Sequence, residues 1–276
     1  MQGSRATLRG LEFYYEHTGA GQGRPRLLFV NGTGGDLRQQ PRLIDGPLAD
    51  AFEILAYDQR GLGQTEKPDV PYTMADYADD AAALLDHVGW DRAHVLGVSF
   101  GGMVSQELAL RHSDRIERLV LCCTSSGGEG GASYPLHELA KLGPDEYMTR
   151  VLELGDTRWG SGEEGRDASR FAKIVEFMKK RQTIPDDAED PETKARGAAR
   201  QLEARLAHDT WDRLGGIRAK TLLCGGRYDG IARPENMENL ASRIPDSELA
   251  WFEGGHGFLL EDRSAFPRIV DFLASR

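Results

Sequence analysis

Residues 94–102 read HVLGVSFGG, and this stretch decides the fold of the chain. Its first five residues form a short apolar run, which is typical of a strand buried on both faces of a parallel sheet. A helical pattern over 100–112 follows directly, so Ser99 stands at a strand-to-helix turn between Gly97 and Gly101. Glycines at these positions leave room for a tight turn that exposes the serine hydroxyl. We therefore predict that Ser99 is a nucleophile carried on a sharp, strained elbow.

Similar apolar runs occur on both sides of the elbow, each ending in small or polar residues. They cover residues 27–30, 52–57, 119–123, 221–224 and 249–252, and a more exposed, partly alternating run covers 11–18. Helical patterns over 74–88, 234–244 and 264–275 alternate with these runs. Strands that alternate with helices predict an α/β fold with a mostly parallel sheet and helices on both of its faces.

One region interrupts the alternation. Between residues 127 and 213 no strand pattern is clear, and helical patterns cover 136–142, 145–154, 168–181 and 193–208. The strand pattern then resumes as if uninterrupted, which favours an insertion over a separate domain on a linker. We expect a core domain formed by 1–126 and 214–276, and a helical cap, or lid, formed by 127–213.

A serine nucleophile needs a base, and the base needs a carboxylate to orient it. His256 follows the last apolar run and is flanked by glycine, which gives it freedom to reach inward. Asp229 follows the apolar run before that one. The six other histidines fall on expected strands, helix surfaces or the cap. We predict Ser99, Asp229 and His256, in that chain order, as a catalytic triad.

Acyl transfer also needs backbone N–H groups that bind a developing oxyanion. One should belong to Phe100, the residue after the nucleophile. The other should lie in loop 31–35, which reads NGTGG and follows an apolar run. Thr33 is the expected donor, with Gly34 as the alternative. The loop does not match a phosphate-binding loop, because no Gly-Lys-Ser/Thr follows it.

Composition excludes several classes of partner. The 276 residues carry 34 Lys and Arg against 44 Asp and Glu, a formal net charge of −10, which argues against nucleic acid and anionic membranes. The three cysteines lie in short apolar runs without zinc spacing, so we expect buried thiols and no metal site. No signal-peptide pattern and no apolar stretch of spanning length is present, so the cytoplasm is the expected location.

Three segments resemble the α/β-hydrolase fold family. Residues 58–65 (DQRGLGQT) resemble its D-x-R-G-x-G-x-S turn, and 89–102 resemble its nucleophile-strand signature. Residues 101–121 are similar to 3-oxoadipate enol-lactonases and their esterase relatives. The resemblance covers residues 8–125 and 214–275 and leaves the cap poorly constrained.

The resemblance implies Ser99 as nucleophile, Asp229 as acid and His256 as base. Many relatives carry His-Gly in the oxyanion loop, whereas this chain carries Asn31-Gly32, a pair that enol-lactonases also tolerate. The turn at 58–65 is expected to be structural and to hold loops beneath the site.

Together these features predict a serine hydrolase that acts on a small carboxylic ester or lactone without a metal or organic cofactor. Hydrolysis of a C–C bond, aminopeptidase action and thioester hydrolysis remain open. So does a non-enzymatic receptor that retained the triad. Expected substrate-binding residues are Gly32, Gly34, Trp159, Met178 and Trp211. Oligomeric state cannot be read from the sequence.

Overall fold

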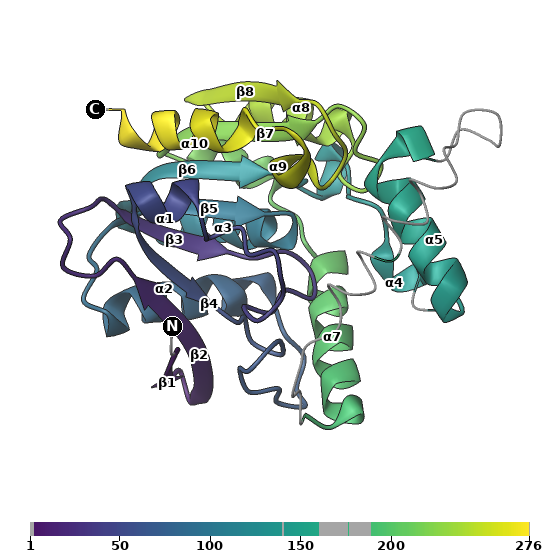
Figure 1. Ribbon diagram of the computed structural model, residues 1–276, viewed down its shortest axis with the longest axis horizontal. Coiled ribbons are helices and arrows are strands. Elements are labelled where there is room, and N and C mark those ends of the chain that lie inside the picture. Colours follow the sequence, from purple (N-terminus) through teal and green to yellow (C-terminus); the bar gives the residue numbers. More distant parts are fainter. Residues whose placement is uncertain (1–2, 140, 160–175, 177–188, 276) are drawn as a thin grey trace.

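A twisted sheet forms the centre of the molecule, and Figure 1 shows its strands side by side from one edge of the sheet to the other. The computed structural model describes residues 3–139, 141–159, 176 and 189–275, and eight strands lie within them. They are β1 (Ser4–Leu8), β2 (Leu11–Thr18), β3 (Arg26–Val30), β4 (Glu53–Tyr57), β5 (Ala93–Val98), β6 (Ile116–Cys122), β7 (Lys220–Gly226) and β8 (Ser247–Phe252). Every apolar run predicted as a strand is therefore confirmed, and β1 was not predicted.

Strand order in the sheet is β1-β2-β4-β3-β5-β6-β7-β8. From β4 to β8 neighbouring strands are parallel, whereas β1 and β2 pair antiparallel and close one edge. Gly97 of β5 lies in register with Val30 of β3 and with Leu121 of β6. The elbow after β5 therefore emerges at the middle of the sheet's carboxyl edge, where open α/β sheets bind ligands.

Helices cover both faces of the sheet, as predicted (Figure 1). The helices of the sheet region are α1 (Pro47–Ala51), α2 (Met74–His87), α3 (Phe100–Arg111), α8 (Pro234–Arg243), α9 (Phe258–Glu261) and α10 (Ala265–Ala274). Thr73 caps α2, since its side chain accepts from the N–H of Asp76 and the Asp76 carboxylate accepts from the N–H of Thr73.

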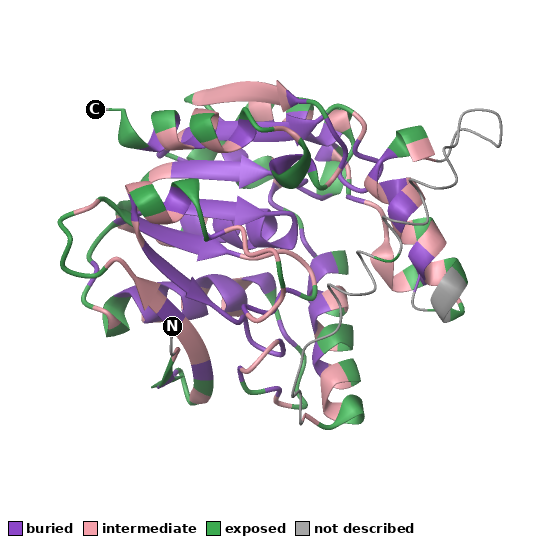
Figure 2. Ribbon diagram, in the orientation of Figure 1, coloured by how far each residue is buried: buried purple, intermediate pink, exposed green. Residues whose placement is uncertain are grey.

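Two hydrophobic clusters hold these layers together. One contains the buried faces of α2, α3 and α8, and the other contains those of α1, α9 and α10. Figure 2 shows the central strands buried between them. Burial on both faces explains why β3 to β7 read as continuous apolar runs rather than alternating ones.

Between β6 and β7 the chain leaves the sheet. This part carries α4 (Leu136–Leu139), α5 (Pro144–Gly155) and α7 (Pro191–Leu206), with short 3₁₀ turns η2 (Gly128–Gly130), η3 (Thr157–Trp159) and η4 (Trp211–Gly216). In Figure 1 the three helices lie beyond the carboxyl edge of the sheet. The predicted helix over 168–181 falls outside the described residues except for Glu176, which is helical.

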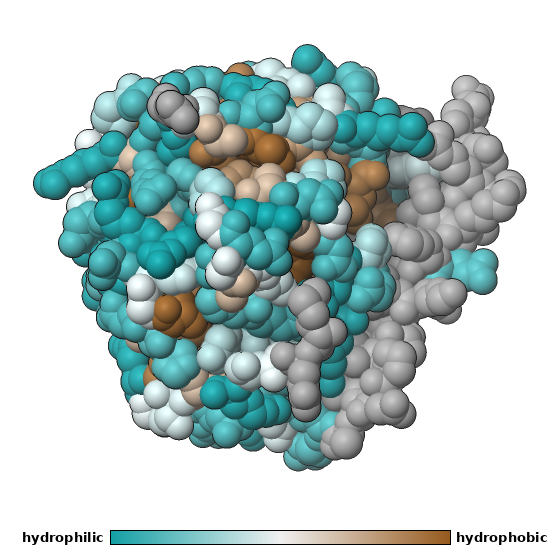
Figure 3. Space-filling model, turned by 60° about the vertical axis from the view of Figure 1, so that its left-hand side comes forward, coloured by the Kyte–Doolittle hydropathy of each residue, from teal (hydrophilic) through white to brown (hydrophobic). Residues whose placement is uncertain are grey.

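The described surface is mostly hydrophilic, with small separate apolar patches on the face shown in Figure 3. Large exposed apolar side chains among the described residues are Val70, Leu206 and Leu260, and they lie far apart in the chain. None of the described helices combines the length and the apolar composition that crossing a membrane requires.

Candidate active site

Ser99 sits between β5 and α3 with a backbone φ of 55°, a left-handed value that is rare for a side chain other than glycine. The turn is tight enough that a Cβ on Gly97 would meet the Gly101 carbonyl and the Ser105 hydroxyl. A Cβ on Gly101 would meet the Val30 carbonyl of the neighbouring strand. Only glycine fits at either position, which gives the G-x-S-x-G spacing its physical cause.

His256 connects Ser99 to Asp229. Its Nε2 lies 2.9 Å from Ser99 Oγ, and its Nδ1 lies 2.8 Å from Asp229 Oδ2. A buried carboxylate accepts from Nδ1–H, which leaves the Nε2 lone pair directed at the serine hydroxyl. The three residues singled out from the sequence are thus brought together from three separate loops.

The Asp229 carboxylate is held on both of its oxygens. Its Oδ1 accepts from the N–H groups of Ile231 at 2.8 Å and Ala232 at 2.9 Å, so Oδ2 remains for His256. The side chain of Asp229 is 1% exposed, whereas that of His256 is 21% exposed. Asp229 is therefore fixed inside the protein, whereas the His256 imidazole is partly exposed.

The carboxyl end of α5 is bonded to the loops that carry Asp229 and His256. The His256 N–H donates to the Gly155 carbonyl at 2.6 Å, and the Gly230 N–H donates to the Leu154 carbonyl at 2.9 Å. The Thr157 N–H donates to the Tyr228 carbonyl at 2.8 Å. The first two bonds satisfy carbonyls at the end of α5, and all three connect this end of the inserted segment to the two loops.

The loop after β3 lies against Ser99, since a Cβ on Gly32 would stand 3.5 Å from Ser99 Cβ. The Gly32 N–H donates to Asn31 Oδ1, and the Gly34 N–H donates to Gln201 Oε1 of α7. Neither the Thr33 N–H nor the Phe100 N–H has an acceptor in the described part of the chain. The two expected oxyanion donors are therefore unengaged, whereas the alternative, Gly34, is already bonded.

Cys123 lies beside the triad and was expected only as a buried thiol. The three cysteines are free and buried. The Cys123 sulfur, an Asp229 oxygen and a His256 nitrogen lie within 4.8 Å of one another, the one such ligand group among the described residues. Burial raises the pKa of the Cys123 thiol well above its usual value, and the Asp229 charge adds to this. A protonated thiol beside an already bonded Asp–His pair does not suit a metal ion.

The turn over residues 58–65 is built into the protein interior. Asp58 accepts from the N–H groups of Leu37 and Gln64, each at 2.8 Å, and Arg60 pairs with Asp80 at 2.5 Å. Burial raises the pKa of Asp58 to about 7, with the charge of Asp36 adding to the effect. These contacts tie loops together beneath the site, in keeping with the structural role expected of this turn.

The expected substrate-binding aromatic residues lie apart from Ser99 in the chain and differ in their surroundings. Trp159 ends η3 and is half-buried. Trp211 packs against the core cluster of α2, α3 and α8, with the Arg243 guanidinium 4.3 Å from its ring centroid. Met178 lies outside the described residues.

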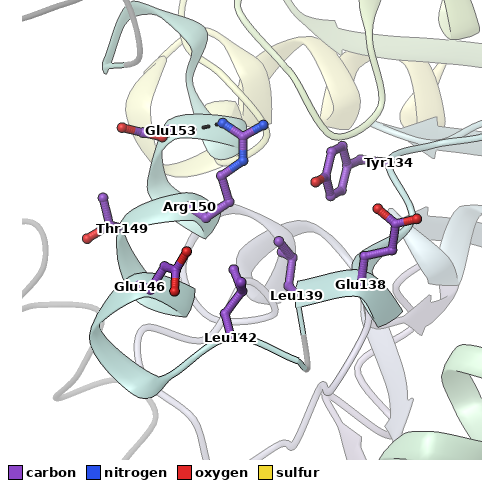
Figure 4. Close-up of a pocket in the computed structure, with 8 residues that line it drawn as sticks. All are labelled: Tyr134, Glu138, Leu139, Leu142, Glu146, Thr149, Arg150 and Glu153. Atoms are coloured by element: carbon purple, nitrogen blue, oxygen red, sulfur yellow. Dashed lines mark hydrogen bonds and ion pairs between the residues drawn. The ribbon is translucent and has the colours of Figure 1, made fainter.

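Two pockets flank Tyr134 in the segment between β6 and β7. One, of about 630 Å³, lies between α4 and α5 and is shown in Figure 4. Its charged side chains are three glutamates and Arg150, which pairs with Glu153 at 3.4 Å. The other, of about 520 Å³, is lined by residues of α7, α8 and the loops after β6 and β7, including Arg205.

Two buried polar residues of α7 were not anticipated from the sequence. Gln201 is fully buried and reaches the oxyanion loop, and Arg205 is 7% exposed and bonds the loop after β6. They occupy one helix face at a spacing of four residues, together with Gly197. The four-residue spacing was the signal in the sequence that these residues share one face of α7. It does not indicate which part of the protein that face contacts.

Comparison with known proteins shows which fold family the chain resembles. The model of a family described as alpha/beta hydrolase fold matches residues 25–150. The enol-lactonase from Burkholderia xenovorans is similar in structure, with a TM-score of 0.79, 26% identity, and coverage of 99% of this chain and 100% of that one.

Two relatives are similar over nearly their whole length. A Variovorax paradoxus protein named as a carbamate hydrolase, RutD, is 30% identical, over 96% of this chain and 97% of its own. The 3-oxoadipate enol-lactonase 2 of Acinetobacter baylyi is 26% identical, over 92% of this chain and 90% of its own. The chain is thus similar to hydrolases that differ in the bond they are named for.

Proposed function

Since the chain belongs to the α/β hydrolase fold family, we propose that it is a serine hydrolase that cleaves a carboxylic ester or lactone through an acyl-enzyme on Ser99. One observation carries this proposal: the continuous hydrogen-bond chain from Ser99 through His256 to Asp229. A serine hydroxyl is a weak nucleophile until a base accepts its proton, and this arrangement supplies that base.

In the acylation step, Ser99 Oγ attacks the carbonyl carbon while His256 Nε2 accepts the hydroxyl proton. Asp229 stabilises the resulting imidazolium through Nδ1. The negative charge that forms on the carbonyl oxygen is bound by the N–H groups of Thr33 and Phe100, which lack other acceptors in the described residues. The imidazolium then gives its proton to the departing alkoxide.

Deacylation repeats these roles with water as the nucleophile. His256 accepts a proton from water, the hydroxide attacks the acyl carbon, and Ser99 leaves as the protonated hydroxyl. No step in this scheme draws on a metal or an organic cofactor. We propose a small or medium-sized organic ester or lactone as the substrate.

We also propose that residues 127–213 form a cap and that 1–126 and 214–276 form the core. The hydrogen bonds from the end of α5 to the loops of Asp229 and His256 support this division, because they tie the inserted segment to the site.

The same triad could serve thioester, C–C bond or amide hydrolysis, and the acyl part of the substrate decides among these. A receptor that retained the triad would bind a ligand without sustained turnover.

The test is a time course of p-nitrophenyl acetate and p-nitrophenyl butyrate hydrolysis by wild type and by Ser99→Ala. We expect sustained turnover by wild type and a loss of roughly 10⁴-fold or more in kcat in the variant, because the attacking oxygen is gone. Ser242→Ala is the matched control, since Ser242 is an exposed serine of α8 that bonds only its own helix.

Turnover by Ser99→Ala at the wild-type rate would refute the proposal. A single slow turnover by wild type, with ligand-dependent stabilisation, would instead indicate a receptor. The ratio of acetate to butyrate turnover then gives a first measure of the acyl site.

A further inference from the structure

Arg205 is a buried cation whose hydrogen bonds all go to neutral groups. One terminal nitrogen donates to the Tyr134 carbonyl at 2.8 Å, and the other donates to Ser133 Oγ at 2.6 Å. The residue is 7% exposed, and its buried Nε has no hydrogen-bond partner among the residues that the structure describes. A guanidinium has five N–H donors, so three of them make no hydrogen bond within the described residues.

No carboxylate within the described ranges forms an ion pair with Arg205. Burial lowers the pKa of Arg205 to about 10, and no neighbouring charge contributes to this shift. Arg60 is buried to the same degree and shows the usual arrangement, with the Asp80 carboxylate 2.5 Å from its Nε. A buried charge without a counter-charge is costly, so Arg205 calls for an anion.

Space for such an anion lies directly beside it. Arg205 lines the pocket of about 520 Å³, whose apolar lining includes Met103, Leu206 and Ile231. At this pocket Arg233 and Glu235 are both exposed, so the two nearly cancel and the buried charge of Arg205 remains. The pocket is therefore apolar in part and cationic at one buried point.

The pocket adjoins segments that carry the triad. Met103 lies one turn after Ser99 on α3, and Ile231 is the residue whose N–H donates to the Asp229 carboxylate. Ser125 follows β6 and also lines the pocket. A molecule bound here would thus touch the supports of both the nucleophile and the acid.

We propose that this pocket binds a carboxylate group through Arg205. A planar carboxylate matches the fork of a guanidinium, and the apolar lining accommodates a short carbon chain attached to it. The carboxylate belongs either to the substrate, as a second, free acid group, or to a separate small acid. The first source rests on the proposed function and the second does not.

Binding is tested first, with glutarate as the probe and 1,5-pentanediol, which has the same carbon chain but no charge and no hydrolysable bond, as the neutral comparison. Thermal unfolding and calorimetry are measured for wild type, Arg205→Met and Arg200→Met. Arg200 is the matched control, because it lies on the same helix but pairs with Glu203 and Asp69 at the surface. We expect glutarate to bind and stabilise both wild type and Arg200→Met. Its affinity for Arg205→Met should be lower by about tenfold or more.

Arg205→Lys guards against a variant that fails to fold, since it retains the charge and should retain weaker glutarate binding. Equal binding of glutarate and 1,5-pentanediol to wild type would overturn the proposal without any variant. Glutarate binding that is the same in folded Arg205→Met as in wild type would also overturn it.

The source of the carboxylate is tested with p-nitrophenyl hydrogen glutarate and p-nitrophenyl valerate, which have the same chain length. A preference for the acid ester of about tenfold or more in kcat/KM, lost in Arg205→Met, assigns the carboxylate to the substrate. Glutarate binding without such a preference assigns it to a separate acid. Glutarate binding to a protein that hydrolyses neither ester would refute the proposed function and leave the anion site standing.

Discussion

Ser99 combines a strained backbone with a fully bonded environment. Its φ of 55° places it in a region that costs energy for a residue with a Cβ, and its N–H donates to the Cys122 carbonyl at 2.8 Å. In this conformation the Ser99 hydroxyl bonds His256 Nε2. It does not cap α3, since the Ser99 side chain makes no hydrogen bond to the start of that helix. Strain at this residue therefore serves to present one oxygen atom.

Asp229→Asn should reduce kcat for p-nitrophenyl butyrate by roughly 10⁴-fold. The amide would still accept from the Ile231 and Ala232 N–H groups, but its NH₂ would face His256 Nδ1. Nδ1 would then have to act as the acceptor, and the proton would move to Nε2, where the lone pair is needed. Steady-state kinetics measure this loss.

Asp212→Asn is the control for that substitution, because Asp212 is an exposed aspartate of η4 outside the triad. A small effect of Asp229→Asn, comparable with that of the control, would contradict the role given to Asp229.

Residue by residue, the sequence located the groups with strong local signals. Gly97, Ser99 and Gly101 stand out because a tight elbow admits few alternatives. Gln201 carried no such signal, although it bonds the Gly34 N–H across 167 positions of the chain. A contact of that kind depends on how α7 lies on the rest of the protein, which local patterns do not encode.

At the scale of elements, the end of α5 and the loop after β8 fit closely. A Cβ on Gly255 would meet the Gly155 carbonyl and the Asp156 backbone. The Gly255 N–H donates to Glu261 Oε2 at 3.0 Å, so the loop is fixed from the other side as well. Gly255 therefore has no free direction in which to accommodate a side chain.

Gly255→Ala should lower kcat by roughly 10- to 100-fold, because the added methyl group displaces His256 from its position beside Ser99. The matched control is Gly257→Ala, where the nearest atom to an added Cβ is the flexible end of Glu261 at 3.0 Å. Kinetics of the two variants should differ, while thermal unfolding confirms that both fold. Equal kcat values would show that this close contact does not position the base.

Three elements of the described residues, β1, α1 and α9, escaped prediction because they are short. β1 has five residues, of which only Ala6 and Leu8 are buried, because it lies at the sheet edge. α1 also has five residues and buries only Leu48. Short elements supply too few periodic positions to rise above the surrounding sequence, whereas the longer helices α2 and α3 were predicted to within one residue at each end.

At the scale of the whole molecule, His208 links stability to pH. Burial lowers its pKa from 6.5 to about 4. Between these values the unfolded chain holds a proton on His208 that the native protein does not. The free energy of unfolding therefore decreases as the pH falls through this range.

We expect this group to lower the free energy of unfolding by about 2 kcal/mol from pH 7 to pH 5. Denaturant unfolding of wild type and His208→Gln at both pH values measures it, since glutamine can still donate to the Ser125 carbonyl but does not titrate. Wild type should lose more stability than the variant on acidification. Identical losses would show that His208 is protonated equally easily in the two states.

The architecture as a whole followed from alternation of strand and helix patterns, which fixed a parallel sheet with the elbow at its carboxyl edge. The arrangement of α4, α5 and α7 could not be predicted in this way. An amphipathic pattern indicates which face of a helix is buried, but not which surface it packs against. Arg205 shows the limit most clearly, since an arginine in a helical pattern reads as a solvent-facing residue until its surroundings are known.

The bonds between α5 and the loops that carry Asp229 and His256 also bear on engineering. Exchanging caps between related hydrolases is an obvious way to change the range of accepted substrates. In this protein a graft that replaced Leu154 and Gly155 with a differently placed backbone would leave the Gly230 and His256 N–H groups without acceptors. A transplant should therefore retain the chain from the end of α5 through Thr157 as part of the recipient, and exchange only what precedes and follows it.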